Sequence, residues 1–161
     1  MDYQRVISAF EKRYRENWIM LIRIHPKMRE KAREIVPKTE KIVDVSLYPD
    51  IQELMVVADA LITDYSSAVF DFILTYKPGF IYAINEQRYD IESGLYYPLT
   101  ATPFTVARNN EELERNIINF DAEEYSNRVT RFLQEKGSVD DGKASERTVR
   151  LIQTLLRRLG E

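Results

Sequence analysis

The stretch LITDYSSAVFDF, residues 61–72, joins a short apolar run to a helical pattern through a small polar turn. Asp59 and Asp64 bound the apolar run, which indicates a short buried strand. A buried strand that leads through a polar turn into a helix is the repeating unit of α/β folds. The stretch therefore predicts an α/β protein.

The same alternation continues along the chain in both directions. Short apolar runs predict strands at residues 18–24, 41–45, 60–63, 80–84 and 104–106. Amphipathic runs predict helices at residues 3–16, 27–36, 50–58, 67–76, 110–119, 121–135 and 143–159. This order predicts a doubly wound, mostly parallel Rossmann-like sheet with helices on both faces. Ligands of such sheets bind beyond the carboxyl ends of the strands.

Composition limits the classes of function. The 161 residues contain no repeat or flexible linker, so we expect a single domain over residues 1–161. A net charge of −3 argues against a nucleic-acid partner. The chain has no cysteine, which excludes disulfides and thiolate metal sites, and nothing else indicates a cofactor. No apolar stretch approaches the about 18 residues of a membrane span, and we expect a cytoplasmic location.

The polar turn after the strand at 60–63 is the first candidate site. Amide groups in the first turn of the following helix lack intrahelical partners, and the helix dipole favours an anion there. The hydroxyls of Ser66 and Ser67, together with Thr63 and Tyr65, complete a candidate phosphate site. Helix capping by either serine uses the same geometry and stays an alternative.

Two carboxylates accompany this turn. Asp71 lies four residues after Ser67 and hence on the same helix face. Its neighbours are apolar, so we expect a partner for it, either the hydroxyls of a ribose or glycerol or, alternatively, Lys77 or a backbone amide. Asp64 would orient a hydroxyl, bind a metal or stabilise the turn, and the sequence does not distinguish among these three roles.

A second candidate follows the strand predicted at 18–24. Arg23 interrupts that apolar run, His25 is the only histidine, and Pro26 suits the first turn of a helix. The pair Arg23 and His25 would neutralise a phosphate. The alternative is a histidine in a turn at the end of a strand, with Arg23 on an exposed edge.

A third candidate opens the last predicted helix. Asp140 and Asp141 precede Gly142 and Lys143, a pattern typical of a helix start. Lys143 and Arg147 would instead contact a ligand if this segment approached the other two.

In this order and spacing, the motifs resemble the CDP-glycerol glycerophosphotransferase family of teichoic-acid polymerases and primases. The resemblance runs from about residue 18 to residue 152. Its motifs are Arg23-x-His25-Pro26, Asp50-x-x-Glu53-Leu54, Ala58-Asp59, residues 61–67, Phe70-Asp71-Phe72, Lys77-Pro78, Tyr82, Tyr89, Gly94 and residues 141–145.

The resemblance implies the C-terminal, donor-binding half of a GT-B glycosyltransferase-like enzyme. It implies a CDP-activated polyol as donor, glycerol phosphate as the transferred group, CMP as the leaving group and a lipid-linked acceptor. It assigns His25 a catalytic role beside the donor diphosphate, with Ser66 and Ser67 on the diphosphate and Asp71 near the polyol. Members associate with the inner face of the cell membrane.

The chain departs from the family pattern in two respects. Asn85 stands in place of the usual Asp, and residues 93–96 read SGLY where the family has RGFY. If these residues contact the donor, CDP-ribitol or another CDP-polyol is an alternative to CDP-glycerol. The N-terminal acceptor half and the strand before residues 3–16 are missing. Without that strand, the strands at 18–24 and 60–63 would pair directly, splay apart or borrow a strand.

Three functions therefore stay open. The first is the donor half of a glycerophosphotransferase that needs a second half for turnover. The second is a stand-alone module that binds nucleotides without turnover, and the third is the donor half of a UDP-sugar GT-B enzyme. A receiver-like signalling domain is rejected, because it needs an acidic pair where this chain has His25-Pro26.

Overall fold

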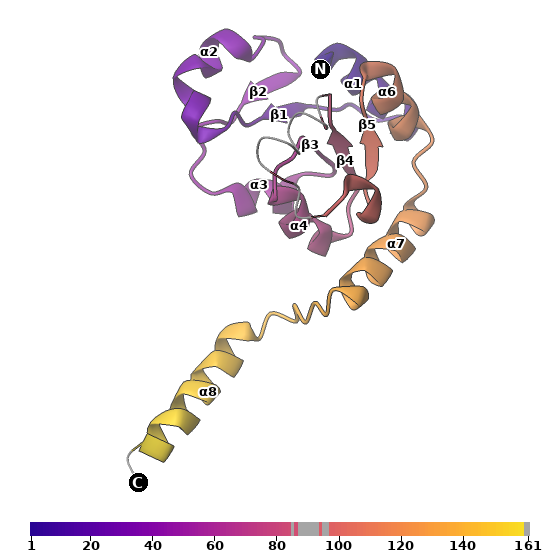
Figure 1. The fold of residues 1–161 in the computed structure, drawn as a ribbon. Coiled ribbons are helices and arrows are strands. Elements are labelled where there is room, and N and C mark those ends of the chain that lie inside the picture. Colours follow the sequence, from indigo (N-terminus) through magenta and orange to yellow (C-terminus); the bar gives the residue numbers. More distant parts are fainter. Residues whose placement is uncertain (85, 87–93, 95–96, 160–161) are drawn as a thin grey trace.

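The computed structural model describes residues 1–84, 86, 94 and 97–159, and Figure 1 shows their arrangement. The strands are β1 (Met20–Ile22), β2 (Ile42–Asp44), β3 (Leu61–Thr63), β4 (Gly79–Tyr82) and β5 (Thr105–Ala107). The α-helices are α1 (Tyr3–Tyr14), α2 (Ala32–Ile35), α3 (Ile51–Val57), α4 (Ala68–Phe72), α6 (Asn110–Ile118), α7 (Ala122–Glu135) and α8 (Ala144–Leu159). This order confirms the alternation of strands and helices predicted from the sequence.

Short 3-10 helices replace parts of two predicted α-helices. The predicted helix at 27–36 is a 3-10 helix over Pro26–Lys31 followed by α2, and the one at 67–76 is α4 followed by Ile73–Thr75. Pro26 lies in the first turn of its helix, as expected from its fixed φ and missing N–H.

The strands form two parallel sheets rather than one. β1 pairs with β2, with Leu21 opposite Val43, and the second sheet has the order β3-β4-β5. Every pair is parallel, which confirms the predicted sheet type. Direct pairing, one of the three outcomes foreseen for the strands at 18–24 and 60–63, does not occur in the described chain, because β1 and β3 lie in different sheets.

The main core lies around β4, the central strand of the larger sheet. Phe80 and Ile81 of β4 are buried. Phe10 of α1 meets Phe80 edge to face, with ring centroids 5.9 Å apart. Phe10 also stacks on Trp18 at 4.5 Å, which ties the start of β1 to the same core. Burial of such aromatic rings removes a large apolar area from water and stabilises the fold.

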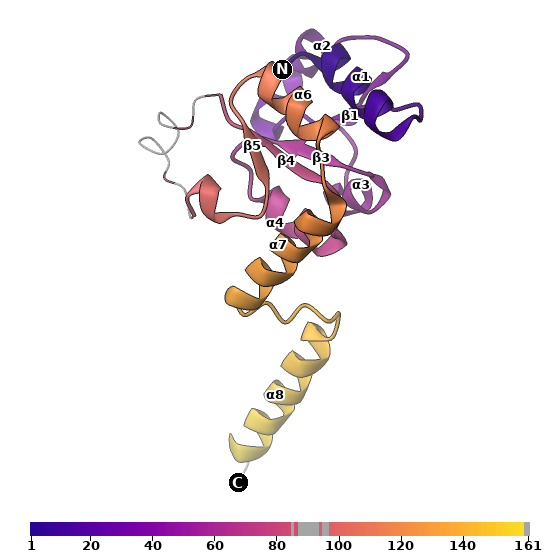
Figure 2. The same ribbon diagram turned by 90° about the vertical axis from the view of Figure 1, so that its right-hand side faces the viewer.

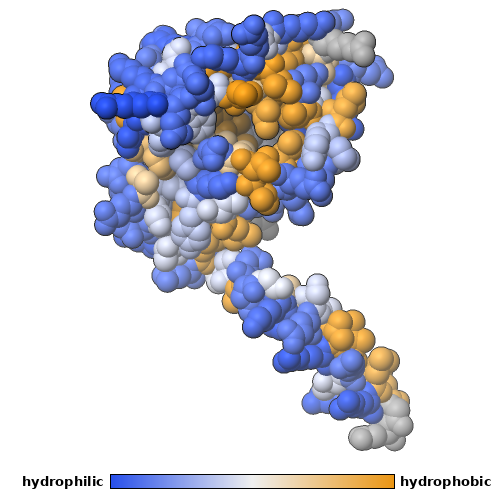
Figure 3. Space-filling model, turned by 180° about the vertical axis from the view of Figure 1, so that it is seen from behind, coloured by the Kyte–Doolittle hydropathy of each residue, from blue (hydrophilic) through white to orange (hydrophobic). Residues whose placement is uncertain are grey.

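The small sheet is covered on one face only. Ile22 and Ile42 pack with Ile7 of α1 in a second, smaller cluster. On the opposite face, Leu21 and Val43 are 41% and 43% exposed. Parallel sheets normally have both faces covered, so the expectation of helices on both faces fails at β1 and β2. Figure 3 shows hydrophobic surface gathered on the back of the domain.

The last two helices differ in how they contact the domain. α7 packs onto it through Tyr125, Val129 and Phe132, which are all buried. α8 has no buried residue, and Figures 1 and 2 show it projecting away from the rest of the molecule. None of the helices in the described part of the chain combines the length and apolar composition needed to cross a bilayer.

Candidate functional site

Arg23 and His25 follow β1, where the sequence predicted them. The half-buried guanidinium of Arg23 donates to the backbone carbonyl oxygens of Val45 and Tyr48. The charge of Arg23 is thus directed at the loop after β2, an arrangement that neither sequence interpretation anticipated. This contact clamps the ends of β1 and β2 together.

His25 is exposed, and one of its ring nitrogens is already engaged. Nδ1 accepts a hydrogen bond from the backbone N–H of Lys27 at 3.2 Å, which caps the 3-10 helix that begins at Pro26. A ring whose Nδ1 accepts carries its proton on Nε2 when neutral. The side of the ring that carries Nε2 is therefore the one that can donate to a ligand.

Ser46 supports this end of β1 and was missed by the sequence analysis. It is only 1% exposed and is the one buried polar residue among the described residues. Its Oγ accepts from the backbone N–H of Ile24 at 3.0 Å, and its own N–H donates to Oδ1 of Asp44 at 2.9 Å. Ser46 thereby fixes the backbone that carries Arg23 and His25.

Tyr48 anchors the same loop from the other side. Its hydroxyl donates to Oε2 of Glu53 on α3 at 2.5 Å. This hydrogen bond is the main reason that the pKa of Tyr48 is raised above its ordinary value, because the carboxylate disfavours a phenolate beside it. The loop from residue 45 to 48 is consequently tied to β1, to β2 and to α3.

The segment from Thr63 to Ser67 follows β3 and reaches solvent. Asp64, Ser66 and Ser67 are exposed, and Thr63 and Tyr65 are half-buried. Ser66 accepts from the backbone N–H of Ala68 at 3.3 Å, so it caps the short helix. Ser67 occupies the N-cap position without a side-chain capping hydrogen bond. The capping alternative therefore applies to Ser66, and ligand contact by Ser67 stays a prediction.

Asp71 differs from the sequence expectation. It is exposed, because its apolar neighbours Val69 and Phe72 turn inward and leave the carboxylate on the outer face of α4. Burial therefore does not demand a partner for it. Lys77 is not that partner, since its Nζ donates to the carbonyl oxygens of Val56 and Ala58 at 2.7 and 2.8 Å.

Aromatic contacts hold α4 in place. Phe70 stacks on Phe132 of α7 with ring centroids 6.0 Å apart and an interplanar angle of 15°. Its edge contacts with Tyr97 and Phe104 complete the cluster. Phe70 lies between Ser67 and Asp71 in the sequence, so this cluster determines the orientation of the candidate segment. The sequence motif contained Phe70 but gave no indication of its partners.

The structure separates the candidates into three groups. Arg23 and His25 belong to the small sheet, whereas Thr63, Asp64, Tyr65, Ser66, Ser67 and Asp71 belong to β3 and α4 of the larger sheet. Lys143 directly precedes α8, the helix that projects away from the domain. Its neighbour Asp141 accepts hydrogen bonds from Lys143 N–H and from Arg147, and the Arg147 contact holds the pKa of Asp141 below its ordinary value.

Some predicted residues lie outside the described part. They are Asn85, Tyr89 and three of the four residues at 93–96. Within the described residues, no cluster of three or more His, Cys, Asp or Glu side chains has metal-binding geometry.

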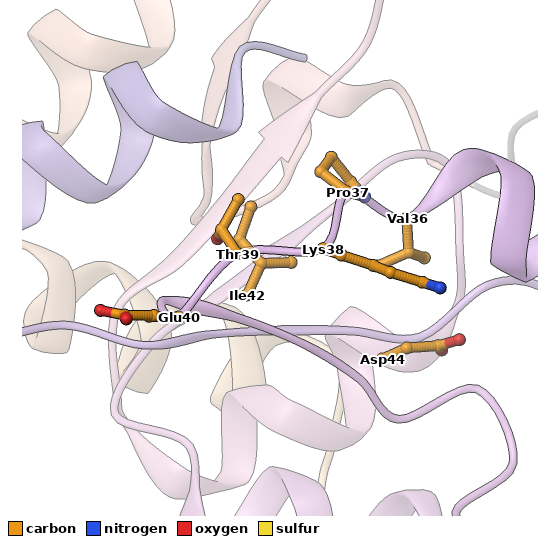
Figure 4. A pocket seen from close by; sticks show the side chains of 7 residues that line it. All are labelled: Val36, Pro37, Lys38, Thr39, Glu40, Ile42 and Asp44. Carbon is orange, nitrogen blue, oxygen red and sulfur yellow. The ribbon is translucent and has the colours of Figure 1, made fainter.

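A hollow lies at the start of β2, among residues that the motifs did not mark. It has a volume of about 530 Å³ and is lined by Val36, Pro37, Lys38, Thr39, Glu40, Ile42 and Asp44. Figure 4 shows these side chains around the loop between α2 and β2. None of the residues predicted from the motifs lines it, and it opens widely to solvent.

The order of motifs on this fold is matched by a known family. The family model described as CDP-Glycerol:Poly(glycerophosphate) glycerophosphotransferase matches residues 3–154. The chain belongs to this family. The resemblance inferred from the motifs is therefore confirmed over nearly the whole chain.

Curated relatives place the family in teichoic acid synthesis. The chain is 32% identical over 150 residues to a teichoic acid glycerol-phosphate transferase of Staphylococcus aureus, covering 91% of this chain and 38% of that protein. It is 28% identical over 157 residues to a teichoic acid ribitol-phosphate primase of Bacillus spizizenii, covering 97% and 39%. Both glycerol-phosphate and ribitol-phosphate enzymes are thus among its relatives.

Solved structures of the wall teichoic acid polymerase TagF share the fold. One aligns with a TM-score of 0.72 and 26% identity, covering 99% of this chain and 39% of the solved chain. Another, soaked with CDPG, aligns with a TM-score of 0.67 over 100% of this chain and 40% of the solved chain. The chain therefore spans about two fifths of the length of each of these relatives and solved chains.

Proposed function

We propose that the chain is the donor-binding half of a teichoic acid glycerophosphotransferase-like enzyme, with a CDP-activated polyol as its donor. Membership of the family supports this proposal. The observation that carries it is the exposed turn after β3, where the Ser67 hydroxyl at the start of α4 is free of capping and Asp71 is exposed one turn further along. These groups are available to a ligand without any rearrangement of the core.

The chemistry that these residues offer is positioning and charge stabilisation. In phosphoryl transfer the protein holds the phosphoryl group in line and stabilises its charge, with little covalent chemistry of its own. Ser67 and the amides of the turn would hold the diphosphate, and Asp71 would accept from polyol hydroxyls. His25 would donate from Nε2 to a phosphate oxygen as CMP leaves.

The identity of the polyol is a finer proposal. Relatives include enzymes named for glycerol phosphate and for ribitol phosphate. We take CDP-glycerol as the first donor to test and CDP-ribitol as the second. The acceptor would be lipid-linked, so the reaction would take place at the inner face of the cell membrane.

Calorimetry on residues 1–161 tests donor binding. CDP-glycerol or CDP-ribitol should bind, and UDP-glucose should not compete. Replacing Ser66 and Ser67 together with Ala should weaken binding by about 1–3 kcal/mol, because the Ser67 hydroxyl contact to a charged diphosphate is lost together with the Ser66 cap that holds the turn. The control is Ser138→Ala, which removes an exposed hydroxyl that donates to Oδ2 of Asp140.

Unchanged affinity in the folded double variant would rule out the assignment of the turn. His25→Asn tests the candidates after β1 separately, because this substitution should also weaken donor binding if the imidazole contacts the diphosphate. CMP release with a lipid-linked acceptor then distinguishes turnover from binding alone. CMP release by residues 1–161 would contradict the need for a second half.

A further inference from the structure

Ser46 extends the pairing of β1 and β2 beyond the last backbone partners. The register of the two strands ends with Ile22 opposite Asp44, so Ile24 lies level with Ser46 two residues further on. There the Oγ of Ser46 accepts the Ile24 N–H at 3.0 Å, in place of a backbone carbonyl. A side chain that is only 1% exposed therefore holds the residue immediately before His25.

The Ser46 hydroxyl is itself held in place by hydrogen bonds of the backbone around it. The backbone N–H of Ser46 donates to Oδ1 of Asp44 at 2.9 Å. The N–H of Val45 donates to the Ile22 carbonyl at 2.9 Å, which closes the strand pair directly before Ser46. A buried acceptor that is fixed in this way determines where the Ile24 N–H lies.

His25 has two local supports, and neither of them reaches the sheet. Pro26 restricts the backbone of the residue before it, and the Lys27 N–H donates to Nδ1 of the ring at 3.2 Å. Both supports belong to the turn itself, so they fix the shape of the turn but not its place on the sheet. The hydrogen bond from Ile24 to Ser46 connects the turn to β2, one residue before the ring.

Arg23 makes a second connection between the same segments, but water has access to it. Its guanidinium donates to the carbonyl oxygens of Val45 and Tyr48, and the contact to Tyr48 is exposed. Water can replace a lost partner at an exposed hydrogen bond, whereas a buried group stays unsatisfied. The Ser46 contact is therefore the connection whose loss displaces the turn most.

We propose that Ser46 is a positioning residue, which holds the His25 imidazole so that Nε2 faces the donor diphosphate. This inference rests on the proposed function, because the proposed function places the His25 ring at that diphosphate. Ser46 is buried and acts through His25, without touching the donor itself. Such an indirect role has a large effect, since a displacement of about 1 Å at a reacting group can lower a rate about 100-fold.

NMR of the full chain tests the positioning without any ligand. His25 is the only histidine, so its ring signals are identified directly. In Ser46→Ala, hydrogen exchange at the Ile24 amide should become faster and the His25 ring signals should shift, because the turn is released from β2. The matched control is Gly79→Ala, which lowers stability by crowding Phe104 in the larger sheet and should leave the ring signals in place.

Calorimetry with CDP-glycerol tests the consequence for binding. Ser46→Ala should weaken binding about 3- to 30-fold, and His25→Asn should weaken it at least as much. The double variant should bind no more weakly than His25→Asn alone, because Ser46 acts only through the ring. Gly79→Ala should bind within about twofold of the unaltered chain, although its stability is also lower.

Ring signals that stay in place in Ser46→Ala would overturn the inference, as would losses of affinity that add in the double variant. If Ser46→Ala does not stay folded, Asp44→Ala removes the support of the same hydroxyl from an exposed position and should shift the ring signals too. Failure of the unaltered chain to bind CDP-glycerol and CDP-ribitol would instead refute the proposed function. The ring signals would then still decide whether Ser46 positions His25.

Discussion

Replacing Ser46 with Ala should weaken the connection between β1 and β2 by a predictable amount. The Oγ of Ser46 accepts the Ile24 N–H at 3.0 Å in a site that is 1% exposed. Without the hydroxyl, water cannot readily reach the Ile24 N–H, and a buried unsatisfied donor costs about 1–3 kcal/mol. The Cβ of alanine keeps most of the side-chain volume, so little cavity cost is added.

Urea unfolding followed by circular dichroism measures this cost. The free energy of unfolding of the Ser46→Ala variant should fall by about 1–3 kcal/mol with an unchanged m-value. Ser138→Ala removes a hydroxyl whose hydrogen bond to Asp140 is exposed. The free energy of unfolding of this variant should lie within about 0.5 kcal/mol of that of the unaltered protein. Equal losses in the two variants would refute the reasoning, because burial would then not matter.

Three further predictions concern the core and one ion pair. Gly79→Ala should destabilise the protein by about 1–3 kcal/mol in urea unfolding, because its Cβ would lie 2.9 Å from a ring carbon of Phe104. Phe132→Ala should cost about 3–5 kcal/mol in the same assay, since it empties the ring cluster that holds α4. The hydrogen bond from Lys41 holds the pKa of Glu11 below its ordinary value. That interaction stabilises the fold above the ordinary pKa of a glutamate and is lost as pH falls, so Lys41→Met should raise the pKa of Glu11 in an NMR titration and move acid unfolding to higher pH.

The sequence predicted the strands and helices because each has a clear period and clear ends. Short apolar runs located all five strands, and Asp2, Asp50, Asn109 and Asp121 cap their helices through side-chain oxygens. These signals are local, so one sequence suffices to find them. The parallel pairing followed from the alternation alone.

What the sequence could not provide depends on contacts between distant segments. Asp71 has apolar neighbours in the sequence. The packing of Phe70 against Phe132 nevertheless orients α4 so that the Asp71 carboxylate faces solvent. Arg23 binds carbonyl groups from a loop more than twenty residues away, as its hydrogen bond to Val45 shows. Ser46 had no motif to mark it, because its importance comes from burial between two strand ends.

The distribution of the core along the chain has a consequence for how the molecule can be divided. Among the described residues, every buried side chain lies between Val6 and Phe132. The hydrophobic interior is thus complete before the glycine at 137, and α8 adds no apolar contact to it. Residues beyond that glycine can be exchanged, shortened or grafted onto another protein at little cost in folding free energy, so selection can alter the tail and the domain separately.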